Sequence, residues 1–538
     1  MSGVVSRAEY RWAAAVALAV VAVSTVPYMV GYLAQTADVR FSGALLNRMD
    51  YHSYLARMWQ GYRGEWQFRL LFTPEEHEGV YFQPFYVALG HLARVLGLEL
   101  PLIYQIARVL LSFLMLLAVY RFIAHFVVSV RTQRLAFLLA TTGSGLGWLT
   151  EVFAPTPPGG VSPMDFWLLD GFTYLAVLTS PHFCAATGLL LAVFLLLLHC
   201  PEGPSLVDGA LAVLASLALG LIHPHILLVA DVLPILCWAV RGVRTRRVAW
   251  RGLAAVAAMG VAQVSLLIYD LWVFRARPVF VGWSVQNVTL SPPLRVYLWG
   301  YGVLLVLGAV GTVAWARRGG QELAFPLLWI GLVAVLVYLP WNLQRRFLEG
   351  VQVPLGLLAG VGLAQIADCV AHWKSQIGRG RRLAQAAVVA LMAVSHLYLT
   401  AGATLAAAAR APALFWPTDV LAGVDWLGEN TSWEETVLAG FETGSLIPAR
   451  IGHRVVLGHW METVDFEGKR EAVTRFFAAG THDVERLALL EEWEVAYVFH
   501  GPDEQALGDF DPGSAPWLKQ TFRAGEVEVY LVALEREP

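Results

Sequence analysis

The sequence predicts an all-α polytopic membrane protein that carries a small soluble α/β domain at its C-terminus. Of its 538 residues, 57% are hydrophobic and only 15% are charged, a composition too apolar for an ordinary soluble protein. The apolar residues fall in long runs, and the composition becomes mixed and polar from Ala413 onwards. The net charge is -3, so the chain lacks the excess of positive charge that is typical of nucleic-acid-binding proteins. The four cysteines have neither a disulfide-like nor a zinc-like spacing.

Apolar runs long enough to cross a bilayer recur throughout residues 1–409. A spanning helix needs about 17 to 25 apolar residues, and about eleven runs satisfy this requirement. They are residues 12–34, 102–128, 134–153, 181–199, 206–222, 224–241, 252–274, 295–316, 323–341, 353–371 and 384–405. We therefore expect residues 1–409 to form a transmembrane domain with an outer loop at 35–81, and residues 410–538 to form an extracytoplasmic α/β domain.

The run from 82 to 98 is shorter and contains polar residues, which indicates an amphipathic helix at the membrane interface. With this assignment the arginine-rich connections alternate with the others and are predicted to be cytoplasmic. The protein is then expected in the cytoplasmic (inner) membrane, with its N-terminus on the cytoplasmic side and its C-terminal domain on the outer side. If 82–98 were a span, Arg131 and Arg134 would move outside and the alternation would break.

Residues 42–66 are predicted to form an aromatic-faced helix in the first outer loop. Tyr51, Leu55 and Met58 recur at helical spacing on one face, so we expect the helix to lie on the membrane surface. Asp50 is in its first turn, where it would meet a substrate that arrives from lipid on one side and from water on the other. The plainer alternative is that Asp50 caps the helix by accepting backbone N–H bonds.

This plan resembles the GT-C class of glycosyltransferases, which includes mannosyltransferases and aminoarabinose transferases. The resemblance rests on a long first outer loop with an acidic residue, a surface helix, the QPFY sequence at 83–86 and a second span led by Arg108. It covers the N-terminal two-thirds of the chain. The fold that it implies has roughly eleven to thirteen spans and a soluble outer domain.

The resemblance also implies a reaction and a catalytic residue. In the GT-C class an acidic residue at the start of the first outer loop acts as catalytic base, and Asp50 is the residue that matches here. Many members carry an acidic pair, whereas this chain has only Met49-Asp50. Glu75, Glu76 and Glu78 are nearby alternatives, although their sequence could equally form a solvated acidic turn. The implied reaction is inverting transfer of a hexose or pentose from a polyprenyl phosphate.

Two arginines at 345 and 346 lie on the predicted outer side, against the charge bias. A guanidinium presents a planar fork suited to phosphate, so Arg345 and Arg346 could hold the phosphate of a lipid carrier. The alternative is that they snorkel toward headgroups at a helix end. The family resemblance favours the phosphate role, in which these arginines and Asp50 converge on one donor above the same leaflet.

Further polar residues gather at predicted outer ends, where they form either a metal or acceptor site or ordinary helix caps. They are Glu151, Asp165, Asp170, His182, His223 and His225. Some GT-C members use a divalent ion with acidic and histidine ligands and others need none, so a divalent metal is a candidate cofactor and not a required one. The His-Pro-His sequence lacks the HExxH spacing of a zinc helix.

Two charges lie about two turns inside predicted spans, where an ionised group costs roughly 2.5 to 3.5 kcal/mol. They are Arg108 and Asp231, and our hypothesis is that they pair with each other or with loop residues to shape a cavity. The glycine-rich run 142–147 follows no predicted strand, so it predicts close helix packing and not a nucleotide loop.

The C-terminal segment alternates short strands with helices. We expect strands at 436–439, 454–457, 495–499 and 527–532, and helices at 418–429, capped by Thr418, and near 467–478 and 483–492. Its loops at 440–444 and 458–463 hold aromatic and acidic residues that could bind a sugar or acceptor. A structural lid is the plainer expectation for this domain.

These observations predict a membrane glycosyltransferase of the cell envelope. Its partners would be a polyprenyl-phosphate sugar donor and a glycan, lipid or protein acceptor. Basic residues are nearly all arginine, which favours a bacterial source. The rival classes are a transporter or flippase, for which we find no convincing internal repeat, and a non-catalytic assembly protein that holds a lipid-linked glycan.

Overall fold

The computed structural model describes residues 5–154, 162–198, 202–319, 323–374 and 379–533. Its internal contacts divide the chain into two compact units. Unit 1 contains Met1–Pro27, Gln105–Ile268 and Thr289–Leu405, and unit 2 contains Tyr28–Tyr104, Tyr269–Val288 and Ala406–Pro538. The C-terminal segment therefore forms a compact unit together with the first outer loop.

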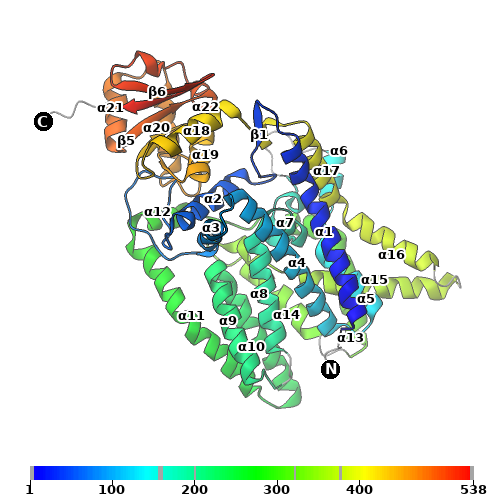
Figure 1. Ribbon diagram of the computed structural model, residues 1–538. Helices are drawn as coiled ribbons and strands as arrows, with labels where there is room; N and C mark the ends of the chain where they lie inside the picture. Colours follow the sequence, from blue (N-terminus) through cyan, green and yellow to red (C-terminus); the bar gives the residue numbers. More distant parts are fainter. Residues whose placement is uncertain (1–4, 155–161, 199–201, 320–322, 375–378, 534–538) are drawn as a thin grey trace. The chain divides into compact units, whose positions relative to one another are not determined.

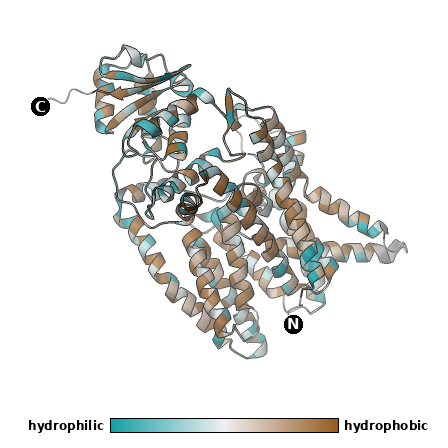
Figure 2. Cartoon of the chain, in the orientation of Figure 1, coloured by the Kyte–Doolittle hydropathy of each residue, from teal (hydrophilic) through white to brown (hydrophobic). Residues whose placement is uncertain are grey.

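Unit 1 consists of helices that are apolar along most of their length (Figures 1 and 2). The helices that lie wholly or partly in it are α1 (Arg7–Leu33), α4 (Leu100–Phe126), α5 (Val130–Thr142), α6 (Gly147–Phe153), α7 (Thr173–Thr179), α8 (Pro181–Leu197), α9 (Leu206–Ile222), α10 (Leu227–Thr245), α11 (Trp250–Ala276), α13 (Leu294–Arg317), α14 (Ala324–Leu336), α15 (Gln352–Lys374), α16 (Arg379–Met392) and α17 (Val394–Ala408). Helix α8 packs beside α9, and α15 packs against both α13 and α5.

Six of the described helices are long and apolar enough to cross a membrane. They are α1, α4, α10 with the turn before it, α11, α13 and α15, and the bent pair of α16 and α17 would make a seventh span. The predicted spans 181–199, 206–222 and 323–341 correspond to helices of 17, 17 and 13 residues. These are shorter than the about 20 residues of a typical spanning helix, so the count of eleven spans stays a prediction.

The predicted span 134–153 is wrong as a continuous helix, because it breaks between α5 and α6. At the break, a Cβ on Gly145 would stand 1.9 Å from the carbonyl oxygen of Gly300 in α13. The backbone N–H groups of Gly145 and Gly147 donate to the carboxylate of Asp165 at 3.0 and 3.2 Å. The glycine-rich run thus does pack closely, as predicted, and the helix break frees its N–H groups to bind a buried acid.

Predicted cytoplasmic segments contact one another in unit 1. Glu9, near the N-terminus, forms an ion pair with Arg134 at 2.8 Å, and Arg131 forms one with Asp368 near the end of α15 at 2.8 Å. The first contact requires an even number of crossings between Glu9 and Arg134. Helices α1 and α4 are long and apolar enough to supply two crossings, and the assignment of 82–98 as a helix that does not cross the membrane stays a prediction.

Unit 2 combines the first outer loop with a mixed α/β structure (Figure 1). Its elements are β1 (Val39–Phe41), α2 (Arg48–Arg63), α3 (Phe85–Leu96), α12 (Pro278–Gln286), β2 (Phe415–Pro417), α18 (Thr418–Asn430), β3 (Thr436–Leu438), α19 (Phe441–Ile451), β4 (Arg454–Val455), α20 (Phe466–Phe477), α21 (Asp483–Glu492), β5 (Val495–His500), α22 (Pro502–Gln505), β6 (Leu518–Ala524) and β7 (Val527–Val532). The sheet order is β4-β3-β5-β7-β6. Strand β3 is parallel to β4 and β5, and β7 is antiparallel to β5 and β6. Strands β1 and β2 pair separately and join the outer loop to the C-terminal segment.

The four predicted strands and the three predicted helices of the C-terminal segment are all present. Three details differ. Strand β6 was not predicted, and the expected loop at 440–444 forms the start of α19 instead. Pro417 is the N-cap residue of α18, and Thr418 begins the helix and donates to the carbonyl of Asp38.

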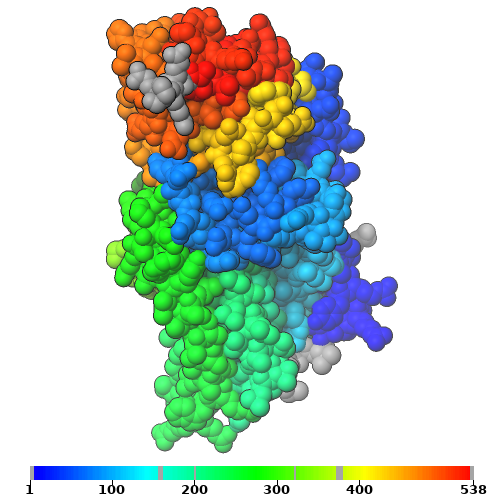
Figure 3. All heavy atoms as spheres, turned by 60° about the vertical axis from the view of Figure 1, so that its left-hand side comes forward, coloured from blue at the N-terminus to red at the C-terminus, as the bar shows by residue number. Residues whose placement is uncertain are grey.

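Helix α2 packs against α3 and α19 within unit 2, and Figure 3 shows the blue α2–α3 region lying against the yellow residues of α18 and α19. A Cβ on Gly61 or Gly90 would stand 1.9 Å from a carbonyl oxygen of the opposing helix, so α2 and α3 need glycine at their crossing. Tyr51, Leu55 and Met58 are buried at this contact. This part of the aromatic face therefore packs against protein, and the location of the helix at the membrane surface stays a prediction.

The predicted interfacial helix at 82–98 is α3. The side that faces away from α2 exposes the apolar side chains of Leu92, Val95 and Leu96. Such a side suits a helix at a membrane surface, and its membrane contact stays a prediction.

Candidate functional site

Asp50 lies in the first turn of α2 and contacts His459 in the loop after β4. Nε2 of His459 is 3.2 Å from Oδ1 of Asp50, and the N–H of Met461 donates to Nδ1 of the same ring at 3.2 Å. Because Nδ1 accepts this bond, Nε2 carries a proton and donates a hydrogen bond to the carboxylate of Asp50. The Asp50 side chain is 42% exposed, whereas His459 is buried. Asn47, and not Asp50, occupies the N-cap position of α2.

A buried ion pair holds the same loop on α2. Glu462 accepts hydrogen bonds from Arg57 at 2.7 Å and from Ser53 at 2.5 Å, and Arg57 also donates to Gln83 at 2.9 Å. Burial acts to raise the pKa of Glu462, but the positive charge of Arg57 and its neighbours outweighs burial and holds that pKa below its usual value. This pair fixes the loop that carries His459 relative to the helix that carries Asp50.

The alternative acids of the first outer loop have other partners. Glu75 forms an ion pair with Lys469. Burial acts to raise the pKa of Glu75, but the hydrogen bonds from Lys469 and Thr73 lower it. The side chains of Glu76 and Glu78 are 79% and 74% exposed and pair with arginines. Asp50 differs from all three because its partner is a histidine held in one orientation.

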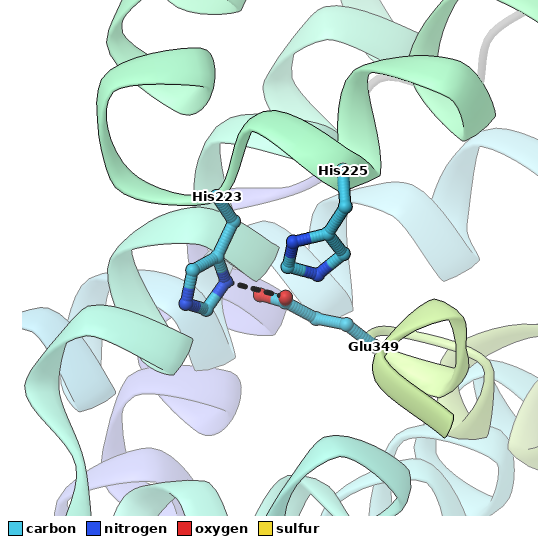
Figure 4. A group of neighbouring side chains, drawn as sticks. All are labelled: His223, His225 and Glu349. Carbon is cyan, nitrogen blue, oxygen red and sulfur yellow. Dashed lines mark hydrogen bonds and ion pairs between the residues drawn. The ribbon is translucent and has the colours of Figure 1, made fainter. Parts of the chain in front are cut away.

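In unit 1, His223 and His225 lie beside Glu349, an acid that the sequence did not single out (Figure 4). Nδ1 of His223 is 2.6 Å from Oε2 of Glu349, and the ring of His223 lies 5.1 Å from the rings of both His182 and His225. One possible ligand atom each from His223, His225 and Glu349 lies within 4.8 Å of the others. We call these three residues the His–Glu group, and it is the one group of this kind found among the described residues.

The two predicted phosphate-binding arginines lie in the turn that ends with Glu349. Nη1 of Arg346 is 3.4 Å from Oδ1 of Asp170, and the Arg345 guanidinium lies 5.0 Å from the ring centre of Trp167. A small pocket lies beside Asp170 and Glu349. Burial raises the pKa of Glu349, although neighbouring basic groups act in the opposite direction.

The remaining candidates are placed elsewhere in unit 1. The hypothesis that Arg108 and Asp231 pair is wrong, because Asp231 accepts a hydrogen bond from Gln263 at 3.4 Å, whereas Arg108 donates to two hydroxyl groups of α1 and a carbonyl of α7. These neutral acceptors satisfy a buried guanidinium without a carboxylate. Glu151 lies in α6 and Asp165 binds the glycine-rich run, so neither belongs to the His–Glu group.

Four residues of these sites were not selected from the sequence: Arg57, Glu349, His459 and Glu462. The loop at 458–463 was selected for its mixture of aromatic and acidic residues, but not for a contact with Asp50. Glu349 could have been found from the sequence, because it is an acid in the same polar turn as the two arginines. The expected convergence of Asp50 with these arginines involves both units and stays a prediction.

No protein-family model matches the sequence, and no curated protein matches it. Solved structures do match the fold. The oligosaccharyltransferase of Archaeoglobus fulgidus in the apo form has a TM-score of 0.54 and 14% identity over 91% of this chain and 69% of that chain. ArnT from Cupriavidus metallidurans, bound to undecaprenyl phosphate, has a TM-score of 0.51 and 15% identity over 96% and 98% of the two chains.

A third match is the mycobacterial arabinofuranosyltransferase AftD, with a TM-score of 0.54 and 15% identity. The alignment covers all of this chain but only 40% of that larger one. All three proteins are GT-C glycosyltransferases. The chain therefore has the fold of this class of polytopic membrane proteins, as the sequence predicted, and identities of 14 to 15% make this a statement about fold alone.

Proposed function

We propose that the protein is an inverting glycosyltransferase of the bacterial inner membrane that moves a sugar from a polyprenyl phosphate to a hydroxyl acceptor on the outer face. The observation that carries this proposal is the exposed carboxylate of Asp50, oriented by the buried ring of His459. The fold supports it, because the similar proteins are glycosyltransferases and the ArnT structure holds undecaprenyl phosphate. The hexose or pentose, the acceptor and the orientation in the membrane belong to this proposal.

Asp50 acts as the general base. As the acceptor oxygen attacks the anomeric carbon, its proton passes to the carboxylate, and the bond between that carbon and the phosphate oxygen breaks. The hydrogen bond from His459 holds the carboxylate in one orientation without neutralising it. The exposed part of the Asp50 side chain leaves it accessible to an incoming hydroxyl.

Arg345 and Arg346 stabilise the charge that develops on the departing lipid phosphate. Nη1 of Arg346 lies 3.4 Å from the buried carboxylate of Asp170, and a lipid phosphate would compete with that carboxylate for the guanidinium. A phosphate already leaves well, and no second carboxylic acid of the glycosidase kind is needed.

The test is transfer by the full-length protein in lipid nanodiscs with polyprenyl-phosphate hexose and pentose donors. Loss of a general base lowers rates by about 10² to 10⁴, so Asp50→Asn should reduce transfer by that factor and leave the melting temperature unchanged. Glu76→Gln is the matched control, because it neutralises a largely exposed acid of the same loop. Full activity of Asp50→Asn would remove Asp50 from the mechanism.

The same assay separates the rival classes. A transporter or flippase would move the donor between leaflets, and an assembly protein would hold it, without forming a new glycosidic bond. Mass spectrometry of the acceptor distinguishes these outcomes, since only a transferase adds the mass of the sugar and releases polyprenyl phosphate. Donor movement without a glycosylated product would overturn the proposal.

A further inference from the structure

We propose that His223, His225 and Glu349 bind a divalent transition-metal ion of the Zn²⁺ type (Figure 4). The ion would join the turn between α9 and α10 to the turn before α15, which also carries Arg345 and Arg346. This proposal does not depend on glycosyl transfer, because metal binding is measured by itself.

The ligand set matches the chemistry of zinc. Two imidazoles and one carboxylate are the three protein ligands of many zinc sites that keep a fourth position open. Zinc–ligand distances of about 2.0 to 2.2 Å place tetrahedral ligand atoms about 3.3 to 3.6 Å apart. The three candidate atoms already lie within 4.8 Å of one another, so small side-chain rotations complete the site. The hydrogen bond between His223 and Glu349 would open as both atoms turn to the ion.

His225 provides the observation that points to a missing ligand. Its Nε2 atom is buried and has no hydrogen-bond partner among the described residues. The same ring lies beside the backbone of Arg346. A buried imidazole nitrogen whose lone pair has no hydrogen-bond partner is available to bind a metal ion. A buried polar atom without a partner destabilises the folded state, and a metal bond would remove that destabilisation.

The candidate ligands lie in the interior of unit 1 and do not form a chance cluster on its surface. The side chains of His223 and Glu349 are only 6% and 2% exposed, and Figure 4 shows both rings and the carboxylate directed toward one another from two separate turns. The pocket beside Glu349 is lined also by Asp170, Thr187 and Gln352.

A metal here would position the arginine turn. Glu349 follows Arg346 by three residues, and the backbone of Arg346 lies beside the His225 ring. An ion bound to both His225 and Glu349 would therefore hold this turn in one conformation and with it both guanidiniums. Arg345 and Arg346 are not ligands in this arrangement.

The experiment uses the full chain in nanodiscs, stripped with a chelator, loaded with Zn²⁺ or Co²⁺ and freed of excess metal. We expect one ion per chain by mass spectrometry of the metal, a higher melting temperature when loaded, and the visible absorption of tetrahedral Co²⁺. Glu349→Gln and His225→Gln should each weaken binding at least tenfold. His482→Gln, an exposed histidine at the start of α21, is the matched control and should bind one ion.

A rescue variant separates loss of a ligand from loss of folding. His225→Cys keeps a zinc ligand, because a thiolate binds Zn²⁺ as imidazole does, so binding should return and the Co²⁺ complex should gain a sulfur charge-transfer band. The proposal is overturned if the stripped wild type takes up no ion. It is equally overturned if the Gln variants, folded by their melting temperatures, retain one ion per chain, since the metal would then bind elsewhere.

Discussion

Each unit of the molecule contains a buried carboxylate, and the two differ in their electrostatic surroundings. The side chains of Glu462 in unit 2 and Glu349 in unit 1 are 5% and 2% exposed. Glu462 is bonded to the guanidinium of Arg57, which is always charged, and Glu349 is bonded to the imidazole of His223. Burial acts to raise the pKa of both acids, yet that of Glu462 is lowered and that of Glu349 is raised.

The partner therefore decides what a buried acid can do. A carboxylate paired with an arginine stays an anion and forms a permanent connection between two segments, here α2 and the loop after β4. A carboxylate paired with imidazoles lacks a fixed counter-charge, so it suits a site where a cation arrives and leaves. The first arrangement holds Asp50 in place, and the second provides the proposed metal site.

The largest effect should follow from breaking the permanent pair. Arg57→Met leaves Glu462 buried without its counter-charge, which should lower the free energy of unfolding by about 3–5 kcal/mol. The double variant Arg57→Met/Glu462→Leu should recover much of this loss. Tryptophan fluorescence during thermal unfolding in detergent measures both. Arg470→Met, in an exposed ion pair with Glu467, is the control and should change little; a double variant as unstable as Arg57→Met would contradict this account.

The next effect concerns the orientation of Asp50. His459→Phe keeps a ring but removes the hydrogen bond to the carboxylate, and a bond to a charged group is worth about 1.5–3 kcal/mol, or about ten- to hundredfold in rate. We expect kcat/KM for transfer to fall by that factor. In the Asp50→Asn background the same substitution should have almost no further effect. An equal loss in both backgrounds would show that His459 does not act through Asp50.

A smaller effect is expected at the arginine turn of unit 1. Arg346→Lys keeps the positive charge but loses the planar fork that matches phosphate. We expect KM for the lipid donor to rise about tenfold, equivalent to about 1.4 kcal/mol, with a smaller change in kcat. Initial rates over a range of donor concentrations separate the two constants. An unchanged KM would show that Arg346 interacts with Asp170 but does not bind the lipid donor.

The smallest effect is a pH dependence. Because the folded-state pKa of Glu462 lies below its unfolded value of about 4.3, its ion pair contributes fully above that unfolded value and loses its contribution as the pH falls through the folded pKa. The melting temperature of Glu462→Gln should therefore lie below that of the wild type at neutral pH, and the gap should narrow on acidification. If the difference in melting temperature instead widened on acidification, the folded-state pKa of Glu462 would have to be raised and not lowered.

Local patterns were enough to predict most elements of both units. Apolar runs predicted the long helices, and short β-branched runs predicted β3, β4, β5 and β7. Strand β6 was missed because its sequence, LKQTFRA, has no clear apolar alternation, and it is stabilised by pairing with β7. Helix α19 was missed because Gly444 and Pro448 are poor helix formers, yet it packs on α2.

The sequence by itself determined the membrane class and, through the resemblance, the GT-C fold, and it singled out Asp50 as the candidate base, because hydropathy, charge alternation and a loop motif are local properties of the chain. Only the tertiary structure decided which groups meet. His459 is 409 residues from Asp50, and Glu349 is 126 residues from His223. Contacts over such separations depend on how helices and loops pack, and that packing also decided that Arg108 and Asp231 have different partners.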